Sequence, residues 1–481
     1  MYRYNLHNKQ HSLMANRATK IICTIGPATE SDEMITRLIK AGANVFRLNM
    51  SHASHEWVKN TIARIRTIAA DNHAHIAILA DLQGPSIRTC ELNEPLSLHP
   101  GDHIEIRTEN SLPTQECSIS VNYDGLMSDV KVGDTMLVDN GALLFEILDI
   151  KPAHLQCRVL TEGVLDSRKH INLPGVALNL PALTEKDLAD LKVALDSDID
   201  FIAMSFVRNA AHVNKLRHHI TRHGCAAKII AKIEDQQALH KLDEIIDAAD
   251  GLLIARGDLG METNLEELPI IQRQIVEKCH LKNTCCIVAT HMLESMIKHP
   301  TPTRAEVSDI STAIQEQVDA LTLSGETTLG IYPIECVEML DRIAQRIEQG
   351  PSFEFSKNCP LNSDIKKITH AAITLANNTD NAALLILSPT DELARLTASL
   401  RPKQSPIYAV CHHSKPAKQM ALIRGVTPLV IPDTTDICTM KSTAIKSLMN
   451  LGYLHDGQAL IIIEHPKISS SENTAISFIR I

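Results

Sequence analysis

The stretches KIIAKIE, residues 228–234, and GLLIARGD, residues 251–258, each join a short apolar run to a charged end. Neither run alternates apolar with polar residues, so each predicts a parallel strand that is buried on both faces. The carboxyl end of such a strand is where α/β barrels and open α/β sheets place their chemistry. A structural ion pair at a strand end is the alternative interpretation. The two stretches therefore predict a class of fold and leave the role of their charged ends open.

Six further apolar runs extend this pattern in both directions. With the first two, the predicted strands are 20–24, 45–48, 76–80, 201–204, 229–231, 252–255, 286–289 and 320–323. Helical periodicity follows each strand but the third, at 32–41, 55–70, 210–223, 236–249, 265–281, 303–317 and 333–349. Eight strands alternating with helices is the sequence form of a (β/α)8 TIM barrel.

One interval interrupts this alternation. Residues 85–180 lack helical periodicity and carry turn signals, such as Pro100-Gly101-Asp102, between short Val/Ile/Leu runs. They predict a small β-barrel lid domain inserted after the third strand, over the carboxyl-end mouth. Thr184-Glu185-Lys186-Asp187 then predicts a capped helix that runs to Leu195.

A separate C-terminal α/β domain is predicted after Gly350-Pro351. Its first helix is predicted at 363–379, and its strands, with helices between them, at 383–387, 407–410, 426–431 and 459–463. The predicted domains are a tail at 1–18, a barrel at 19–84 and 181–350, a lid at 85–180 and a C-terminal domain at 351–481.

Composition excludes several classes of protein. The formal net charge of −10 and the aromatic content of 3% argue against nucleic-acid binding, which uses positive charge and stacking surfaces. No run reaches the ~20 apolar residues that a membrane span needs, and the polar start of the chain resembles no secretory signal. Twelve cysteines without CxxC spacing indicate reduced thiols and a cytoplasmic protein.

Polar or ionisable residues lie at the ends of seven of the eight predicted barrel strands. Besides Lys232, Glu234, Arg256, Gly257 and Asp258, they are Arg47, Asn49, Ser51, His52, Asp81, Arg88, Ser205, Thr290, Ser324, Gly325 and Glu326. Parallel strands bring their carboxyl ends to one mouth, so seven such ends together favour an active site over separate ion pairs.

The residue types at this mouth predict a chemistry. Glu234 and Asp258 are hard oxygen ligands, and two carboxylates with the other ligands from substrate and water are typical of Mg²⁺. Lys232 is a point charge that can stabilise a transferring phosphoryl group or an enolate. Arg47 and Arg88 are candidates for phosphate recognition.

Other residues of the mouth predict further contacts. The amides at Gly257 and Asp258, which precede a short helical turn, can hold a carboxylate, and Thr290 can pass a proton through water. Asn49, Ser51 and Asp81 form an oxygen-rich cluster without a lysine neighbour, which suits a monovalent cation. No GxxxxGK[ST] or GxGxxG is present, so a nucleotide must bind without those loops. On residue type alone, Arg168-Lys169 of the lid indicates a solvated turn.

The chain resembles the pyruvate kinase family from about Lys20 to its C-terminus. The matching segments are TKIICTIGPAT (19–29), NVFRLNMSH (44–52), DLQGPSIRT (81–89), INLPG (171–175), AKIED (231–235), ARGDLG (255–260), MLESM (292–296), PTRAE (302–306) and LSGET (323–327). The DLQGP wording is similar to one bacterial branch. The resemblance implies phosphoryl transfer from phosphoenolpyruvate to ADP, giving pyruvate and ATP in the last step of glycolysis. It also implies Mg²⁺ or Mn²⁺, a possible K⁺, and a homotetramer with the 302–306 loop near a subunit contact.

The resemblance also assigns roles by position. It implies that Arg47 contacts the substrate phosphate, that Lys232 stabilises the transferring phosphoryl group and that Glu234 and Asp258 hold Mg²⁺. The substrate carboxylate is implied at Gly257, Asp258 and Thr290, with Ser324 and Glu326 near the proton path. A monovalent cation is implied at Asn49, Ser51, Asp81 and the carbonyl of Leu82. The nucleotide is implied at Asn49, Met50, Ser51, His52, Arg88 and Lys169, which reverses the solvated-turn interpretation of Lys169.

Three departures from the family pattern limit these inferences. His291 replaces the usual glutamine beside Thr290 and can alter the mouth or a subunit contact. Ser86 stands where many members have glutamate and others lysine, which leaves the K⁺ requirement open. Ser388-Pro389-Thr390-Asp391-Glu392 replaces the effector-phosphate loop, and 465–469 lack the expected glycines. Proline removes a donor amide and two carboxylates repel phosphate, so we expect sugar-phosphate activation to be weak or absent.

Two other classes explain part of the pattern. An Mg²⁺-dependent aldolase or lyase acting on phosphoenolpyruvate or pyruvate explains Glu234 and Asp258, but it does not explain the lid, Lys169 or the monovalent-cation cluster. A catalytically silent, ligand-sensing relative explains the C-terminal domain. The intact Lys232, Glu234, Asp258 and Thr290 argue against it.

Overall fold

The computed structural model describes residues 17–388, 390–433, 436–465 and 474–481. The tail up to residue 16, Pro389 of the substituted loop and 466–469 of the closing segment lie outside the described residues. Arg17 and Ala18, expected in the tail, are bonded to the barrel. Arg17 Nε donates to Asp341 Oδ1 at 2.8 Å, and the Ala18 amide donates to Glu348 Oε2 at 2.8 Å.

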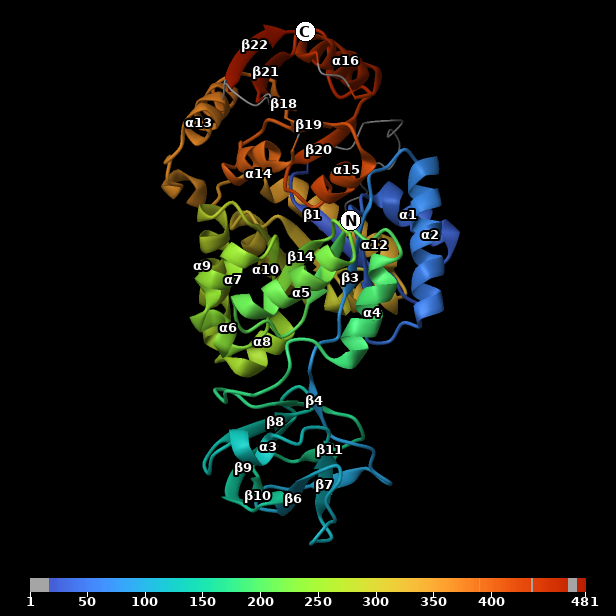
Figure 1. Cartoon of the computed structure of the whole chain (residues 1–481), viewed down its shortest axis with the longest axis vertical. Helices are drawn as coiled ribbons and strands as arrows, with labels where there is room; N and C mark the ends of the chain where they lie inside the picture. The colour runs from blue at the N-terminus through green and yellow to red at the C-terminus, as the bar shows by residue number, and fades with distance from the viewer. Residues whose placement is uncertain (1–16, 389, 434–435, 466–473) are drawn as a thin grey trace, which may run out of the picture.

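Eight parallel strands close into a barrel at the centre of the molecule (Figure 1). They are β1 (Lys20–Thr24), β2 (Val45–Asn49), β3 (Ala77–Asp81), β13 (Phe201–Met204), β14 (Lys228–Ile233), β15 (Gly251–Ala255), β16 (Cys285–Ala289) and β17 (Ala320–Leu323). Each strand pairs with its neighbours in chain order, and β17 pairs with β1. All eight pairings are parallel, so the carboxyl ends meet at one face, here called the mouth. The predicted TIM barrel is confirmed.

The barrel strands are apolar throughout because each of their two faces meets a separate core. Ile22, Leu79 and Ile230 belong to the core enclosed by the strands. Their neighbours Ile21, Ile78 and Ile229 belong to the core between the strands and the surrounding helices. A strand with no wet face has no reason to alternate apolar with polar residues.

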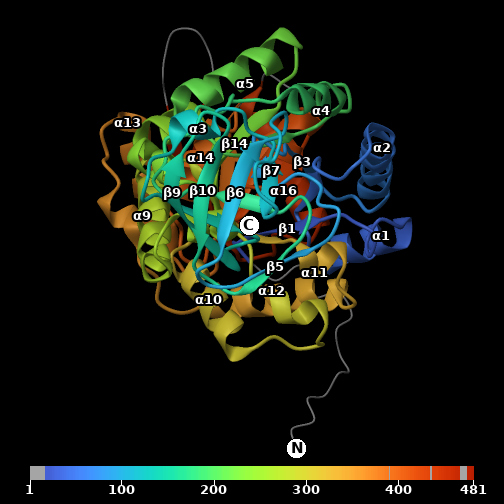
Figure 2. The ribbon, with the colours of Figure 1, turned by 90° about the horizontal axis from the view of Figure 1, so that it is seen from below.

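Helices surround the barrel as a ring, which Figure 2 shows along the long axis of the molecule. They are α1 (Asp32–Ala41), α2 (His55–Asp71), α4 (Glu185–Leu195), α5 (Ala210–Arg222), α6 (Gln236–His240), α7 (Leu242–Ala248), α8 (Arg256–Glu262), α9 (Leu268–Leu281), α10 (Arg304–Gln315), α11 (Gly325–Thr328) and α12 (Pro333–Ile347). Short 3₁₀ turns lie at η1 (Leu265–Glu267), η2 (Glu294–Ile297) and η3 (Phe355–Asn358). No described helix is long and apolar enough to cross a membrane.

Two helix predictions can be compared with the structure directly. The start predicted at Thr184 is confirmed: its side chain accepts from the Asp187 amide, and Asp187 returns a bond to the Thr184 amide. The single helix predicted over 236–249 is wrong, because Lys241 leaves the helical region and separates α6 from α7. That segment contains neither glycine nor proline to mark the break.

An inserted β module follows β3 and lies beyond the mouth, at the bottom of Figure 1. It comprises β4 (Ile87–Arg88), β5 (Leu96–Leu98), β6 (His103–Thr108), β7 (Ser118–Val121), α3 (Leu126–Asp129), β8 (Thr135–Val138), β9 (Leu143–Ile150), β10 (His154–Val159), β11 (Gly163–Leu165) and β12 (His170–Asn172). Seven of these strands run β4-β12-β8-β9-β10-β6-β7. A bridge between Thr89 and Val121 joins the two edges, as a small barrel requires.

A C-terminal α/β module lies at the opposite end of the molecule (Figure 1). Its elements are α13 (Asp364–Asn377), β18 (Ala382–Leu387), α14 (Glu392–Ser399), β19 (Ile407–Cys411), α15 (Ser414–Met420), β20 (Val426–Val430), α16 (Ile437–Asn450), β21 (Ala459–Glu464) and β22 (Ala475–Arg480). The last strand was not predicted. It is a short antiparallel edge strand beside β21 with half-exposed apolar residues, a pattern too brief to identify in sequence.

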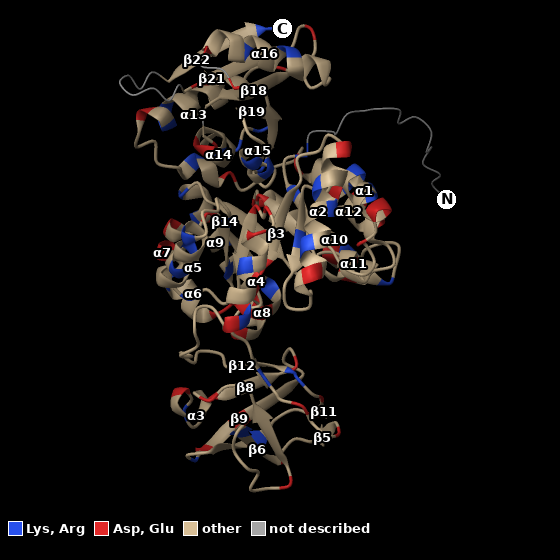
Figure 3. Ribbon diagram, turned by 45° about the vertical axis from the view of Figure 1, so that its right-hand side comes forward, with Lys and Arg blue, Asp and Glu red and all other residues tan. Residues whose placement is uncertain are grey.

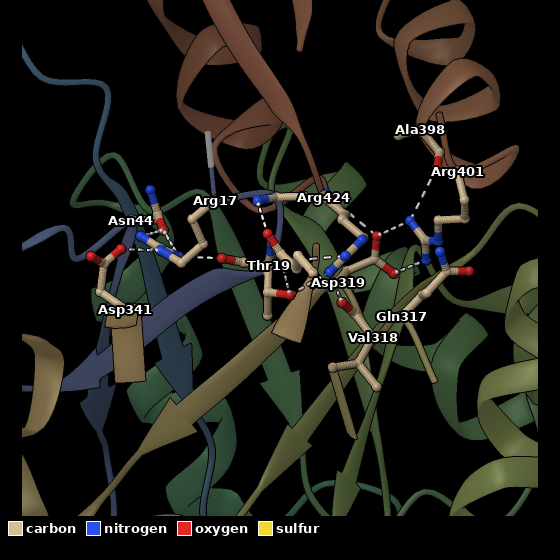
Figure 4. Close-up of polar contacts among 12 residues, drawn as sticks. Arg17, Thr19, Asn44, Gln317, Val318, Asp319, Asp341, Ala398, Arg401 and Arg424 are labelled. Carbon is tan, nitrogen blue, oxygen red and sulfur yellow. Dashed lines mark hydrogen bonds and ion pairs between the residues drawn. The ribbon is translucent and has the colours of Figure 1, made fainter. Parts of the chain in front are cut away.

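Buried ion pairs tie the C-terminal module to the amino ends of the barrel strands (Figure 4). This amino-end network consists of Lys20, Asp319, Glu348, Arg401 and Arg424. Arg401 NH1 donates to Asp319 Oδ1 at 3.0 Å, and Arg424 NH2 lies 3.2 Å from Glu348 Oε1. Lys20 Nζ donates to the Val426 carbonyl at 2.8 Å. The network fixes this module to the end of the barrel remote from the mouth.

Candidate active site

Four charges of alternating sign lie in a row across neighbouring strand ends at the mouth. Arg47 Nε lies 2.7 Å from Asp81 Oδ2. Lys232 Nζ lies 3.4 Å from Asp81 Oδ1 and 2.9 Å from Glu234 Oε1. β2, β3 and β14 bring these residues together although they are far apart in the chain. The structure thus places Arg47, Lys232 and Glu234 in one site, as the sequence predicts.

The pKa values of the residues in this row are shifted in different directions. Burial by itself would lower the pKa of Lys232, but Asp81 and Glu234 outweigh it and the pKa is raised. Burial would raise the pKa of Asp81, but Lys232 and Arg47 hold it below its usual value. Burial raises the pKa of Glu234 to about 7; Lys232 opposes this rise and Asp258 adds to it. Glu234 is therefore the carboxylate of the row whose charged form burial disfavours in spite of its pair with Lys232.

Glu234 and Asp258 together fit a divalent cation. Asp258 lies in the first turn of α8, whose acidic positions are coloured red on the ribbon at the end of the barrel that faces the inserted module (Figure 3). A cation between the two carboxylates would offset the burial, and the smaller repulsion from Asp258, that raise the pKa of Glu234. Within the described residues, no group of three or more His, Cys, Asp or Glu side chains could hold a metal ion alone. The remaining ligands would come from substrate and water, as is usual for Mg²⁺ and suits Mn²⁺.

Thr290 and Gly257 form the wall of the mouth next to Asp258. The Gly257 amide donates to Thr290 Oγ1 at 2.9 Å, and Thr290 Oγ1 donates to the Ala289 carbonyl at 2.5 Å. Thr290 has a φ of 73°, which is strained for a β-branched residue. The sequence suggested that Gly257 and Asp258 precede a helical turn; instead, α8 begins at Arg256 and contains both.

Arg256 is a supporting residue to which the sequence assigned no role. Its NH2 group donates to the Thr290 carbonyl at 2.6 Å, and its NH1 group donates to Asp309 Oδ1 at 2.8 Å. The guanidinium thereby holds the strained Thr290 backbone in place. Its position directly after an apolar strand, beside Gly257 and Asp258, was the available signal.

His291 follows Thr290 in the same left-handed conformation, with a φ of 55°, and its side chain is exposed. No hydrogen bond or ion pair in the described structure explains the replacement of glutamine by histidine here. The expectation that His291 alters the mouth or a subunit contact stays a prediction.

The sequence was wrong about the surroundings of the predicted monovalent-cation cluster. Asp81 does have a lysine neighbour, Lys232, which the fold brings to 3.4 Å from a strand remote in sequence. Asp81 Oδ1 nevertheless accepts no hydrogen bond, and it is buried. Asn49 Oδ1 accepts from the Ser51 amide at 3.2 Å, and the Leu82 carbonyl accepts from Ser205 Oγ at 2.8 Å. A buried carboxylate oxygen whose nearest ammonium, that of Lys232, lies 3.4 Å away fits a further cation beside these groups.

The predicted nucleotide-binding residues occupy two separate places. Asn49, Met50, Ser51 and His52 form the turn after β2, where Lys186 Nζ donates to the Met50 carbonyl at 2.8 Å. Arg88 and Lys169 belong to the inserted module. Arg88 NH1 donates to the Arg168 carbonyl at 3.0 Å, and Lys169 Nζ lies 3.0 Å from Asp139 Oδ2. The solvated turn suggested by residue type does hold for Arg168, whose side chain is 72% exposed.

Glu326 and Ser324 follow β17 at the mouth. The carboxylate of Glu326 is buried and accepts from the amides of Leu293 at 2.9 Å and Ser324 at 2.8 Å. Burial raises the pKa of Glu326 in spite of these bonds. The carboxylate holds together the turns after β16 and β17, which is a positioning contact.

A buried lysine between two carboxylates, a further carboxylate nearby and a β module inserted beyond one barrel mouth are typical of a class of group-transfer barrel enzyme. Comparison with known proteins identifies the family within this class. The family model "Pyruvate kinase, barrel domain" matches residues 16–337, and "Pyruvate kinase, alpha/beta domain" matches residues 366–479. The chain belongs to the pyruvate kinase family: it is a phosphotransferase of glycolysis that transfers the phosphoryl group of phosphoenolpyruvate to ADP.

Individual relatives agree with this assignment. The chain is 38% identical to a pyruvate kinase of Geobacillus stearothermophilus over 95% of its own length and 79% of that protein. It is 37% identical to plastidial pyruvate kinase 2 of Arabidopsis thaliana, over 93% of this chain and 78% of that protein. A crystal structure of a pyruvate kinase from Cryptosporidium parvum superposes with a TM-score of 0.91 at 32% identity, covering 97% of this chain and 96% of that one.

Proposed function

We propose that the row Arg47-Asp81-Lys232-Glu234 carries out the phosphoryl transfer of the family reaction. The observation that carries this proposal is the position of Lys232, whose ammonium lies between Asp81 and Glu234 and is kept charged by both. A fixed charge in a site shielded from water stabilises a transferring phosphoryl group without reorganisation. Arg47, whose guanidinium Asp81 and Thr24 orient, holds the phosphate of phosphoenolpyruvate.

Glu234 and Asp258 are the residues that would hold Mg²⁺ or Mn²⁺. When bound, the ion neutralises charge on the transferring group and the substrate. Thr290 and the amides of Gly257 and Asp258 would orient the substrate carboxylate. Thr290 Oγ1 would also relay a proton to the enolate in this proposal. Support for this arrangement comes from the raised pKa of Glu234 and from the bond that holds Gly257 next to Thr290; a bound carboxylate would replace Thr290 Oγ1 as the acceptor of the Gly257 amide.

We further propose K⁺ at Asp81, Asn49, Ser51 and the Leu82 carbonyl. Asp81 Oδ1, which is buried and accepts no hydrogen bond, supports this site. Arg88 Nε donates to Ser86 Oγ at 3.3 Å. Ser86 is uncharged, so it supplies no positive charge that could substitute for the K⁺ ion. A titration of activity with K⁺ at constant ionic strength tests the requirement.

The inserted module acts as a lid in this proposal. ADP binds between the turn Asn49–His52 and the lid residues Arg88 and Lys169. When the lid closes, Lys169 leaves its ion pair with Asp139 and binds a nucleotide phosphate. The pairing of β4 with β12, which carries Arg88 next to His170, supports a joint movement of these residues.

A homotetramer is the proposed assembly. Leu329 and Ile331 are 70% and 66% exposed, and Phe478 of β22 is 44% exposed. Apolar residues exposed to this extent are typical of surfaces that another subunit covers. Sedimentation analysis tests the assembly. A cytoplasmic location is proposed from the free, buried thiols such as Cys23, Cys279 and Cys286.

One assay tests the proposed function against its alternatives: pyruvate production from phosphoenolpyruvate with ADP and without it. ADP-dependent pyruvate with equimolar ATP is expected. Pyruvate without ADP would indicate a lyase or hydrolase, and its absence under both conditions would indicate a silent relative.

A further inference from the structure

The turn Ser205-Phe206, directly after β13, lies between the inserted module and the charged row. Ser205 Oγ accepts from Lys232 Nζ at 2.8 Å and donates to the Leu82 carbonyl at 2.8 Å. A hydroxyl has one proton to donate, and here that proton goes to the Leu82 carbonyl. The two bonds together fix the orientation of the hydroxyl group. Ser205 is buried. It therefore fixes the ammonium of Lys232 relative to the end of β3.

Phe206 makes a similar connection to the other member of the pair. Its amide donates to Glu234 Oε2 at 2.6 Å. Its φ of 52° lies in the left-handed region, where a bulky side chain is a genuine outlier. Strain of this kind persists only where the surroundings impose it, and it gathers at functional sites. Two adjacent residues thus hold Lys232 and Glu234, one through a hydroxyl and the other through an amide.

The opposite side of this turn touches both chain crossings into the inserted module. At Gly84, where the chain leaves the barrel, a Cβ atom would lie 2.8 Å from Ser205 Cβ and 3.1 Å from Phe206 Cδ2. Where the chain returns, the His170 ring lies 6.0 Å from the Phe206 ring, with an interplanar angle of 51°. His170 pairs with Arg88 across β12 and β4. Strand β12, to which β4 pairs, therefore lies against Phe206 through the His170 ring.

We propose that Ser205 and Phe206 are positioning residues that couple the lid to Lys232 and Glu234. Movement of the β4–β12 pair displaces the Phe206 ring. The Phe206 amide and the Ser205 hydroxyl pass this displacement to Glu234 and Lys232. The charged row then reaches its working arrangement only when Arg88 and Lys169 stand over the mouth. This inference rests on the proposed function and adds a device that links nucleotide capture to phosphoryl transfer.

The test uses Ser205→Ala and Phe206→Ala in the full-length chain. Each has a matched control remote from the mouth. Ser399→Ala removes another buried hydroxyl, which donates to Asn283 Oδ1 at 2.7 Å. Phe355→Ala removes another phenylalanine that faces a histidine, with ring centroids 5.7 Å apart. Steady-state constants for both substrates are measured together with hydrogen–deuterium exchange of residues 84–88 and 170–178, with and without Mg²⁺ and ADP.

Ser205→Ala is expected to lower kcat about tenfold or more, with the KM for phosphoenolpyruvate within about threefold of wild type. Phe206→Ala is expected to lower kcat, raise the KM for ADP and accelerate exchange in both crossings. The kcat of the double variant should be no more than about threefold below that of the less active single variant, because both residues act through one element. Phe206→Leu, which keeps bulk, should lie between wild type and Phe206→Ala.

Three results would overturn the coupling: kcat values equal to those of the controls, unchanged exchange at the crossings in Phe206→Ala, or a double variant whose loss is the product of the single losses. Failure of the proposed function is a different result, because wild type would then make no ADP-dependent pyruvate whatever the exchange pattern shows.

Discussion

Lys228 and Lys232 lie at the two ends of strand β14, and their surroundings differ in kind. Lys228, at the amino end, forms an ion pair with Asp391 of the C-terminal module, and the pKa of Asp391 falls below its usual value because Lys228 and Arg395 outweigh burial. Lys232, at the mouth, lies between two carboxylates, and the pKa of Glu234 is still raised to about 7. The charge at the amino end is already satisfied within the chain.

The same contrast holds for the two ends of the whole barrel. The amino-end network pairs Asp319 with Arg401 and Glu348 with Arg424, from a module that lies directly on it. The mouth instead keeps an Asp81 oxygen that accepts no hydrogen bond, a strained Thr290 and a Glu234 whose pKa burial raises to about 7. The carboxylates of the amino-end network are therefore paired within the chain, although Lys20 is not, whereas the mouth leaves carboxylates that a bound cation would pair. Each prediction below changes a residue at one of these two ends.

The largest effect on ligand binding is expected for Glu234→Gln. Removing this carboxylate should weaken Mg²⁺ binding in the presence of phosphoenolpyruvate by about 100-fold or more, because a neutral amide oxygen is a poorer ligand for a hard cation. Titration calorimetry measures the change. Glu262→Gln is the matched control, since burial also raises the pKa of Glu262 to about 7 although it bonds Asn172. An equal loss in both variants would place the metal elsewhere.

Asp319→Ala should produce the largest loss of stability. It leaves the guanidinium of Arg401 buried without its partner, a change that typically costs about 3–5 kcal/mol. The kcat of the protein that remains folded should stay within about threefold of wild type. Thermal unfolding and steady-state assays at a lower temperature measure the two effects. Asp243→Ala breaks an exposed pair with Lys278 and should cost about 1 kcal/mol or less. A kcat more than about threefold below wild type in the folded variant would contradict a purely structural role for this end.

The amino end should also show a pH dependence through Lys20. Burial, and next the charge of Arg17, lower the pKa of Lys20 to about 7. The unfolded chain keeps this proton up to about pH 10.5. Between these values the unfolded state binds more protons, so Lys20 makes stability rise with pH from about 7 to 10.5.

Lys20→Met removes this contribution. The Tm of wild type minus that of Lys20→Met should therefore increase between pH 7 and pH 9, by about 2 °C or more. Differential scanning calorimetry of both proteins in the same buffers gives the comparison. A difference that is constant or decreases over this range would contradict the assigned pKa.

The smallest effect is expected at the substituted effector loop. Asp391→Asn should cost about 1 kcal/mol and leave kcat unchanged, because the ion pair with Lys228 is only partly buried. Hexose phosphates should leave the dependence of the wild-type rate on phosphoenolpyruvate unchanged, since the carboxylates of Asp391 and Glu392 in the substituted loop repel phosphate. Sigmoidal kinetics that a hexose phosphate abolishes, and that return on mutation of Ser388 or Thr390, would overturn this expectation.

The sequence predicted the regular parts of this molecule well. The barrel strands were found because double burial removes alternation, and the residues of the mouth were found because parallel strands end together. β1, β13 and β17 begin within one residue of the prediction and end where predicted. The start of α4 was found because its capping box is a local hydrogen-bond pattern.

What the sequence did not predict depends on contacts between distant segments. Lys232 approaches Asp81 because β3, β13 and β14 are adjacent in the barrel, and no local pattern shows this. The Phe206 backbone conformation is imposed by its surroundings and has no signature in residue type. The break at Lys241 and the edge strand β22 lack the glycine, proline or long periodicity that a sequence argument needs.

The central claim is that Lys232 is the charge that stabilises the transferring phosphoryl group, whereas Lys228 on the same strand is structural. The direct test compares Lys232→Met with Lys228→Met in the ADP-dependent formation of pyruvate, with Mg²⁺-dependent binding of phosphoenolpyruvate measured in parallel. Lys232→Met should keep that binding and lose kcat by about 10²–10³-fold or more, while Lys228→Met stays within about threefold of wild type. Near-normal turnover in Lys232→Met, or an equal loss in both variants, would contradict the claim.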